Sequence, residues 1–126
     1  MVNVQCDKCH KVFQLNPEDI RSSVVMLDSG YADVHFFVCP NCETPTISGI
    51  VDSKITAMTF ELNDLKRRYK MYLKQGSKDA ALRMIGLIEK KKNKLSEYVD
   101  QLIAEAKQKL EMKVVYGNYV LVNKKQ

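Results

Sequence analysis

The chain has 126 residues, of which 45% are apolar and 28% charged, and this length predicts one or two small domains. Its 5 Gly and 3 Pro, with well-mixed charges, argue against a disordered or collagen-like chain. The apolar runs are too short to cross a bilayer, and Met1–Val4 lacks the basic and apolar parts of a signal peptide. We therefore expect a folded protein of a reducing cytoplasm.

Charge is distributed unevenly along the sequence. Residues 1–52 contain three basic and seven acidic side chains, for a net charge of −4. Residues 53–126 contain 17 basic and 8 acidic side chains, for a net charge of +9. Because the sign reverses where the cysteines also stop, the sequence predicts structural units with different roles.

All four cysteines lie in the first third of the chain, as the two C-x-x-C pairs Cys6, Cys9 and Cys39, Cys42. The two-residue spacer lets both thiolates of a tight turn face one ion, and two such turns complete a tetrahedron. Four thiolates suit zinc, which has no geometric preference against that arrangement. We therefore predict one structural Zn²⁺ per chain. The 29 residues between the pairs exceed the common spacing of about 15 to 20, so this segment must fold as an excursion.

A haem-attachment interpretation competes with zinc, because Cys6–His10 reads C-x-x-C-H. The residues that could then serve as an axial ligand are Met58, Met71 and Met84. Haem attachment normally requires export and leaves Cys39 and Cys42 unexplained. With four thiolates available, His10 is expected to be exposed beside its knuckle, and His35, next to Phe36 and Phe37, to be structural.

Two further interpretations concern cysteine redox chemistry. Cys39–Cys42 resembles a thioredoxin-type redox pair, but such a pair should open a helix, and the following Glu43–Thr46 is poor helix material. Two disulfides are the third possibility, which a reducing compartment disfavours.

Apolar alternation before and after each knuckle predicts strands on both sides of it. The expected strands contain Val2 and Val4, Val12–Leu15, Val24–Leu27, Tyr31–Val38 and Thr46–Val51, with a turn or helix start at Asn16–Asp19. This order is that of a zinc ribbon, whereas a treble clef would need a helix soon after Cys42, which Pro45 opposes. About fifty residues bury little core, so metal binding, on the order of 10 kcal/mol, should be the main source of stability. A four-cysteine site has no open position for water, so metal-assisted hydrolysis is not expected.

The first fifty residues resemble small zinc-ribbon proteins encoded by tailed bacteriophages. The motif runs from Cys6-x-x-Cys9 through Phe13, Leu15, Pro17, Glu18 and Ile20 to Phe37-x-Cys39-Pro40-x-Cys42. In those proteins a ribbon precedes a lysine- and glutamate-rich helical region. The resemblance implies a ribbon fold and a phage or prophage origin, with residence in the host cytoplasm or the virion. Ribbons attached to transcription and translation machinery share the knuckles alone.

From Ser53 onward the apolar residues follow a heptad rhythm, which predicts two helices joined at Gln75–Ser77. The seam of the first helix is expected to contain Ile55, Met58, Leu62, Leu65, Tyr69 and Tyr72. That of the second is expected to contain Ile85, Ile88, Lys92, Leu95, Val99, Leu102 and Ala106. Helices of about 22 and 35 residues with so short a link must form an antiparallel hairpin.

The C-terminal segment predicts strands at Val114–Tyr116 and Tyr119–Val122 around a Gly117-Asn118 loop. Because an isolated hairpin is marginal, these strands should add to the ribbon sheet or to a partner's edge. The predicted fold is therefore α+β, with a zinc ribbon at 1–52, an antiparallel coiled-coil-like hairpin at 53–113, and a strand or hairpin with a basic tail at 114–126.

The predicted helices also contain a cluster of basic residues that could bind phosphate: Lys66, Arg67, Arg68, Lys70, Arg83, Lys90, Lys91 and Lys94. The antiparallel arrangement places Lys90 and Lys91 opposite Glu61–Asp64, so a solvated helical face is an equally good interpretation.

The sequence contains no recognisable set of catalytic residues, so we do not expect an enzyme. The favoured hypothesis is a non-catalytic protein that acts through protein contacts or self-association through the hairpin, as a phage assembly component or an adaptor on a host machine. It would take no small-molecule substrate and no membrane as partner. The alternative is a nucleic-acid-binding regulator that uses the basic helices.

Overall fold

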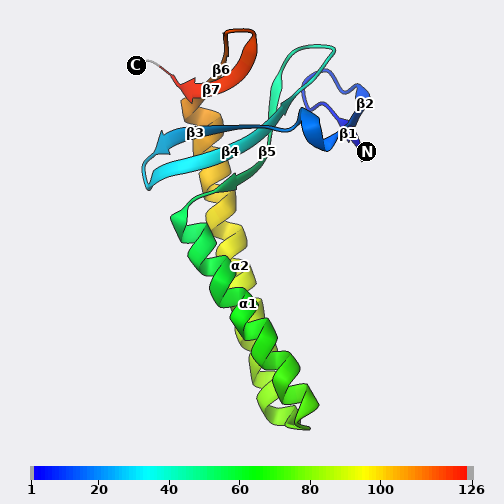
Figure 1. The fold of residues 1–126 in the computed structure, drawn as a ribbon, viewed down its shortest axis with the longest axis vertical. Coiled ribbons are helices and arrows are strands. Elements are labelled where there is room, and N and C mark those ends of the chain that lie inside the picture. The colour runs from blue at the N-terminus through cyan, green and yellow to red at the C-terminus, as the bar shows by residue number, and fades with distance from the viewer. Residues whose placement is uncertain (1, 125–126) are drawn as a thin grey trace. The chain divides into compact units, whose positions relative to one another are not determined.

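The computed structural model describes residues 2–124, which form an α+β fold of antiparallel strands and two packed helices (Figure 1). The elements, in chain order, are β1 (Val2–Gln5), β2 (Val12–Leu15), a 3₁₀ turn (Pro17–Asp19), β3 (Arg21–Leu27), β4 (Gly30–Val38), β5 (Pro45–Val51), α1 (Ser53–Lys74), α2 (Lys78–Lys109), β6 (Leu110–Val115) and β7 (Asn118–Asn123). Neither helix is long and apolar enough to span a membrane.

The chain divides into two compact units. One contains the described residues up to Val51 together with those from Leu102 onward, and the other is Asp52–Gln101. The strands that follow α2 therefore belong to the same unit as the cysteines. Of the predicted basic tail, Lys124 is described, and Lys125 and Gln126 lie outside the described residues.

The first unit contains three antiparallel sheets, in the strand orders β1-β2, β3-β4-β5 and β6-β7. Its strands are thus more numerous than a ribbon plus one C-terminal hairpin. One face of the three-stranded sheet forms the core, because alternating side chains point to the same side. The buried residues of the sheet and of the segment from Leu102 onward are Val25, Leu27, Ala32, Val34, Phe36, Phe37, Ile50, Leu102, Ala106, Leu110 and Leu121.

Alternate burial along β4 continues to Phe36 across an irregularity in the β4–β5 ladder. The register shifts between His35 and Phe36, and both Phe36 and Phe37 are buried. The Phe37 ring contacts Phe13 of β2 edge to face, with ring centroids 5.9 Å apart. This contact joins the β1–β2 hairpin to the strand that leads into Cys39.

The C-terminal hairpin packs against β3 without joining its hydrogen-bond ladder. The Leu121 N–H donates to Ser23 Oγ over 3.1 Å, and Asn123 Nδ2 donates to the carbonyl of Met26 over 2.8 Å. Of the two expectations for these strands, addition to the ribbon sheet is therefore wrong, and addition to a partner's edge stays a prediction. The side-chain bonds and the buried Leu110 and Leu121 hold the hairpin instead.

The loop of that hairpin also differs from expectation by one residue. Val115 pairs with Asn118, so the loop is Tyr116-Gly117 and not Gly117-Asn118. Both loop residues have positive φ, 50° and 78°. Glycine thus serves at the second loop position, where a turn with two left-handed residues favours it.

The second unit is a helical hairpin, and local interactions set both the beginning and the end of α1. Asp52 caps α1 by accepting a 2.7 Å hydrogen bond from the Ile55 N–H, and its other carboxylate oxygen accepts one from the Tyr98 hydroxyl. Gly76, with φ of 73°, follows the end of α1 in the left-handed conformation that favours glycine.

The seam of the hairpin follows the predicted rhythm in α1 and departs from it in α2. All six predicted α1 residues are buried or half-buried, as are Ile88, Leu95, Val99 and Leu102 of α2. Ile85 is 41% exposed and Lys92 is exposed, so the prediction that these two residues lie in the seam is wrong. The link after α1 places Ala81 in the seam, and helical spacing from Ala81 brings Met84 and Lys91 inward instead.

Lys91 pairs with Glu61 across the hairpin, so a half-buried lysine of the seam has an acidic partner. This agrees with the expectation that Lys91 lies opposite Glu61–Asp64.

Candidate metal centre

The two C-x-x-C segments fold into the same turn. In each, the N–H of the first cysteine donates to the carbonyl five residues later, and the N–H four residues after that cysteine donates to the cysteine carbonyl. These bonds measure 3.0 and 2.9 Å in the turn of Cys6, and 3.1 and 2.9 Å in the turn of Cys39. The sequence thus builds two equivalent knuckles 33 residues apart.

The residue after each second cysteine adopts a left-handed conformation. His10 has φ of 63° and Glu43 has φ of 58°, and both side chains are exposed. The chain must reverse here so that the next N–H groups point back toward the turn. The structure thus places His10 beside the knuckle, where its backbone shapes the turn.

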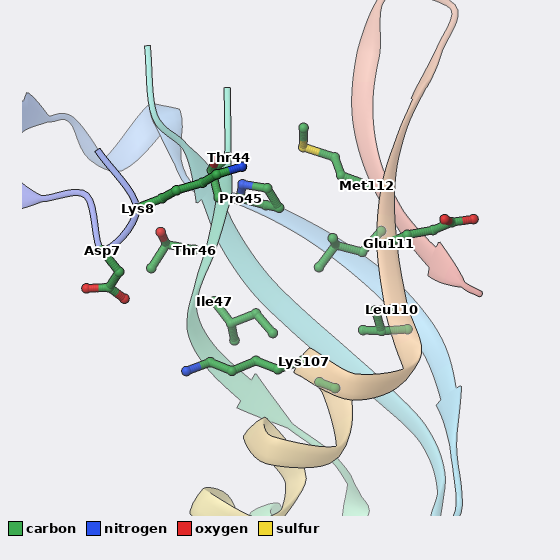
Figure 2. A pocket seen from close by; sticks show the side chains of 12 residues that line it. Asp7, Lys8, Thr44, Pro45, Thr46, Ile47, Lys107, Leu110, Glu111 and Met112 are labelled. Carbon is green, nitrogen blue, oxygen red and sulfur yellow. The ribbon is translucent and has the colours of Figure 1, made fainter. Parts of the chain in front are cut away.

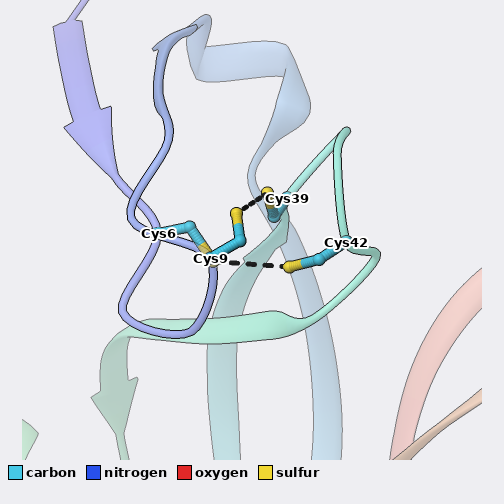
Figure 3. A group of neighbouring side chains, drawn as sticks. All are labelled: Cys6, Cys9, Cys39 and Cys42. Atoms are coloured by element: carbon cyan, nitrogen blue, oxygen red, sulfur yellow. Dashed lines mark hydrogen bonds between the residues drawn. The ribbon is translucent and has the colours of Figure 1, made fainter.

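The knuckles bring all four sulfurs together (Figure 3). Cys6 Sγ lies 3.5 Å from Cys42 Sγ, Cys9 Sγ lies 3.6 Å from Cys39 Sγ, and all four atoms are within 4.8 Å of one another. An ion with metal–sulfur bonds of about 2.3 Å sets the sulfurs of a tetrahedron about 3.8 Å apart. The four cysteines can therefore hold one metal ion.

The sulfur separations also bear on the competing interpretations. The four cysteines are free thiols, and the closest sulfurs are well beyond the roughly 2.05 Å of a disulfide. Strand β5 follows Cys42, so the second pair does not open a helix as a thioredoxin-type pair does. Cys6 and Cys9 face Cys39 and Cys42, the two residues that haem attachment leaves unexplained.

Burial divides the four ligands into two classes. Cys6 and Cys39, the first cysteine of each knuckle, are 0% and 1% exposed, whereas Cys9 and Cys42 are half-buried. A bound ion would thus be shielded from one side by the packed first cysteines. With four protein sulfurs around it, it would have no open coordination position.

Hydrogen bonds favour the thiolate form of two of the cysteines. The Thr44 side chain, whose Oγ1 lies 3.2 Å from Cys42 Sγ, is the main cause that lowers the pKa of Cys42 to about 6. The backbone N–H of Lys11 and the side chain of Asn41 lower the pKa of Cys9. Because a metal ion binds thiolates, the lowered pKa values of Cys42 and Cys9 favour the metal over protons at neutral pH.

Cys39 behaves differently because it is buried. The backbone N–H of Cys42 favours its thiolate, but burial and the hydrogen bonds with the thiols of Cys9 and Cys42 outweigh it, and the pKa of Cys39 is raised. Cys39 therefore needs the ion to remain a thiolate near pH 7.

The predicted basic cluster is partly neutralised by acidic neighbours. Arg67 and Arg68 both pair with Asp64, at 2.6 and 3.0 Å, and Lys91 pairs with Glu61. The remaining members are exposed and make no salt bridge within residues 2–124: Lys66, Lys70, Arg83, Lys90 and Lys94. Lys90 and Lys94 share a shallow groove with Glu61 and Asp64.

Sequence reasoning missed Thr44 and a pocket beside the second knuckle (Figure 2). The pocket has a volume of about 180 Å³ and lies between β5 and β6, with apolar lining from Ile47, Leu110 and Leu121. Its lining comes from segments far apart in the sequence, so no motif marks it. Thr44, by contrast, follows the last cysteine by two residues, and a hydroxyl at that spacing could have been noted as a thiolate partner.

Replacing Cys39 by Ser should abolish metal binding and unfold the first unit, because a hydroxyl is a poor substitute for a buried thiolate. Elemental analysis should give about one metal ion per chain for the parent protein and none for Cys39→Ser. Circular dichroism should show loss of the sheet signal with the helices of Asp52–Gln101 retained. His10→Asn is the matched control, since asparagine tolerates positive φ, and it should keep the ion. Full metal content in Cys39→Ser would contradict the four-sulfur site.

Replacing Thr44 by Val should raise the pKa of Cys42 toward its ordinary value of 9.0. Protons then compete better with the metal at pH 7, so affinity should fall by about tenfold or more, and release on acidification should begin at higher pH. Competition with a chromophoric chelator between pH 5 and 8 measures both. Thr46→Val, two residues along β5, is the control and should leave the release curve in place. Coincident curves for the two variants would show that Thr44 does not tune the site.

Comparison of the chain with protein-family models, with curated proteins and with solved structures finds no match. The best-defined feature of this chain is a set of four cysteine sulfurs arranged to hold one metal ion.

Proposed function

We propose that this chain is a non-catalytic zinc protein that acts through protein–protein contacts. In this proposal one Zn²⁺ holds the N-terminal knuckles as a ribbon, and the helical hairpin of Asp52–Gln101 presents the contact surface. The observation that carries the proposal is the set of four sulfurs within 4.8 Å of one another. A closed set of four protein ligands stabilises a fold and leaves no position for a substrate or an activated water.

Zinc is the ion that best suits the donors. Thiolates are soft ligands, and a four-sulfur tetrahedron is typical of zinc or of an iron–sulfur centre. Here the cross-knuckle sulfur separations of 3.5 and 3.6 Å are close to the edge of a tetrahedron around one ion. Two C-x-x-C knuckles of equal geometry are also the usual source of a structural zinc site.

The cysteine motif also supports a proposal for the biological setting. Its likeness to small zinc-ribbon proteins of tailed bacteriophages supports a role as a phage assembly component or as an adaptor on a host machine. The protein would then work in the host cytoplasm or in the virion.

The hairpin supports a role in protein contacts because apolar side chains remain exposed near its turn. Leu73 of α1 and Leu82 of α2 are 51% and 65% exposed, and Ile85, which lies about one helical turn after Leu82, is also exposed. Long aliphatic side chains gathered on one part of a helical surface are typical of a contact that another protein covers.

Replacing Leu82 and Ile85 by Glu should remove this contact while keeping the helices, since glutamate is a good helix former. Affinity capture from a lysate of the encoding host, quantified by mass spectrometry, should show at least a tenfold loss of the proteins retained by the parent chain. Val24→Glu, which changes a side chain 70% exposed in the other unit, is the control and should retain them. Equal capture by the parent and the Leu82→Glu, Ile85→Glu chain would contradict a role for this surface.

Nucleic-acid binding is a second candidate, which the charge of the hairpin favours. Residues 65–94 contain eleven basic and two acidic side chains, a net charge of +9, although Arg67, Arg68 and Lys91 have acidic partners. The exposed lysines that lack such partners are the ones available to phosphate.

Reversing Lys66, Lys70, Lys90 and Lys94 to Glu tests this candidate. If the hairpin binds DNA or RNA, the affinity should fall steeply with salt concentration. The four charge reversals should then remove most of the affinity and most of its dependence on salt. Fluorescence anisotropy with labelled oligonucleotides between 50 and 200 mM salt measures this. Lys113→Glu with Lys124→Glu is the control in the other unit. Absence of salt-dependent oligonucleotide binding by the parent chain would contradict this candidate, and protein contact would then be the one remaining proposal.

A further inference from the structure

The outward face of α1 combines apolar and charged residues in an unusual way. Phe60 is 75% exposed and Met71 is 49% exposed, and eleven residues, or about three helical turns, bring them onto the same face. Between them on this face lie Asp64 and Arg67, joined by a 2.6 Å ion pair. Phe60 and Met71 thus offer two exposed apolar side chains on one helix face to a second surface.

The order of these four residues is self-complementary. Phe60 and Met71 lie equally far from the midpoint between Leu65 and Lys66, and so do Asp64 and Arg67. If a second α1 packs antiparallel with a twofold axis at that midpoint, each Phe60 meets the Met71 of the other copy. Each Asp64 then meets the other Arg67. In an isologous interface a residue pairing must be repeated in both directions, and this face satisfies that condition.

The charge of the hairpin selects the antiparallel direction. The half next to the first unit, residues 52–64 and 95–101, contains five acidic and one basic side chain, a net charge of −4. The half that contains the turn, residues 65–94, has a net charge of +9. A parallel pair would place like charges together, whereas an antiparallel pair places the basic half of one copy beside the acidic half of the other.

We infer that a second copy of this chain covers the outward face of α1, in an antiparallel dimer centred between Leu65 and Lys66. The inference rests on the proposed function in treating the hairpin as a contact surface, and it adds the partner and the register. The pairing runs from Ala57 to Lys74, about 27 Å of helix on each copy. Methionine against an aromatic ring is a favourable contact, and each Asp64, already paired with Arg67 and Arg68 of its own chain, gains the Arg67 of the other copy.

Photo-cross-linking tests both partner and register. The full-length zinc-loaded protein is made with p-benzoylphenylalanine in place of Phe60, because benzophenone reacts readily with methionine side chains. Within one chain the Cα atoms of residues 60 and 71 are about 16 Å apart along the helix, beyond reach of the probe. A cross-link to Met71 therefore has to join two copies, and an equal mixture of ¹⁴N- and ¹⁵N-labelled chains identifies it by mass spectrometry.

The expected result is a covalent dimer linked from position 60 to Met71 of the other copy. Cross-links from position 60 to the neighbourhood of residue 60 in a second copy would indicate a parallel pair and overturn the inference, as would a monomer at all concentrations. The control carries the probe in place of Tyr116, which is 99% exposed in the C-terminal hairpin, and should give no dimer.

Sedimentation equilibrium with Met71→Glu gives a second, independent measurement. Glutamate keeps the helix but places a charge against Phe60 of the other copy, so the dimer dissociation constant should rise at least tenfold. Leu82→Glu with Ile85→Glu lies on α2 and should leave the dimer intact. A parent chain that forms this dimer but retains no lysate protein would contradict the proposed function alone. A parent chain that retains lysate proteins but stays monomeric would contradict this inference alone. An unchanged dissociation constant in Met71→Glu would overturn the proposed register.

Discussion

The first unit depends on four sulfurs held within 4.8 Å of one another by two knuckles of the same geometry. Each knuckle is a local turn, closed by two backbone hydrogen bonds and reversed by one left-handed residue. Neither turn can fix the other, because 29 residues separate Cys9 from Cys39. The contact between Phe13 and Phe37 brings β2 and β4 together, and a shared ion would join the turns at their tips.

The core of the sheet lies in the same compact unit as this centre. The buried residues of β3, β4 and β5 share that unit with the buried Leu102 and Ala106 of α2 and with Leu110 and Leu121 of the last hairpin. Segments from both ends of the sequence therefore share one core, although the charge reversal near residue 52 suggests a simple division. The helical hairpin between them has its own seam and its own capping residues, so it forms a second unit with separate causes of stability.

Local patterns predicted most of the elements because their causes are local. The C-x-x-C spacing predicted the knuckles, alternation predicted the strands around them, and Gly76 marked the end of α1 within two residues. The α2 seam could not be predicted from the sequence, because two helical patterns offset by one residue fit equally well. One pattern runs through Ile85 and Lys92, and the other runs through Met84 and Lys91. Burial of Ala81 decides between them and leaves Ile85 exposed. The packing of β7 against β3 and the pocket beside β5 join residues that are far apart in the sequence, so their proximity depends on the folded chain.

The ion pair between Lys91 and Glu61 has a consequence for how the two helices choose their alignment. An apolar seam tolerates sliding by a heptad, since leucine and tyrosine side chains pack acceptably in neighbouring positions. A half-buried ammonium group does not, because any other alignment would leave it without its carboxylate in a poorly solvated place. Replacing both residues by leucine would thus stabilise the hairpin but reduce its specificity, because the two helices could then pack in more than one alignment.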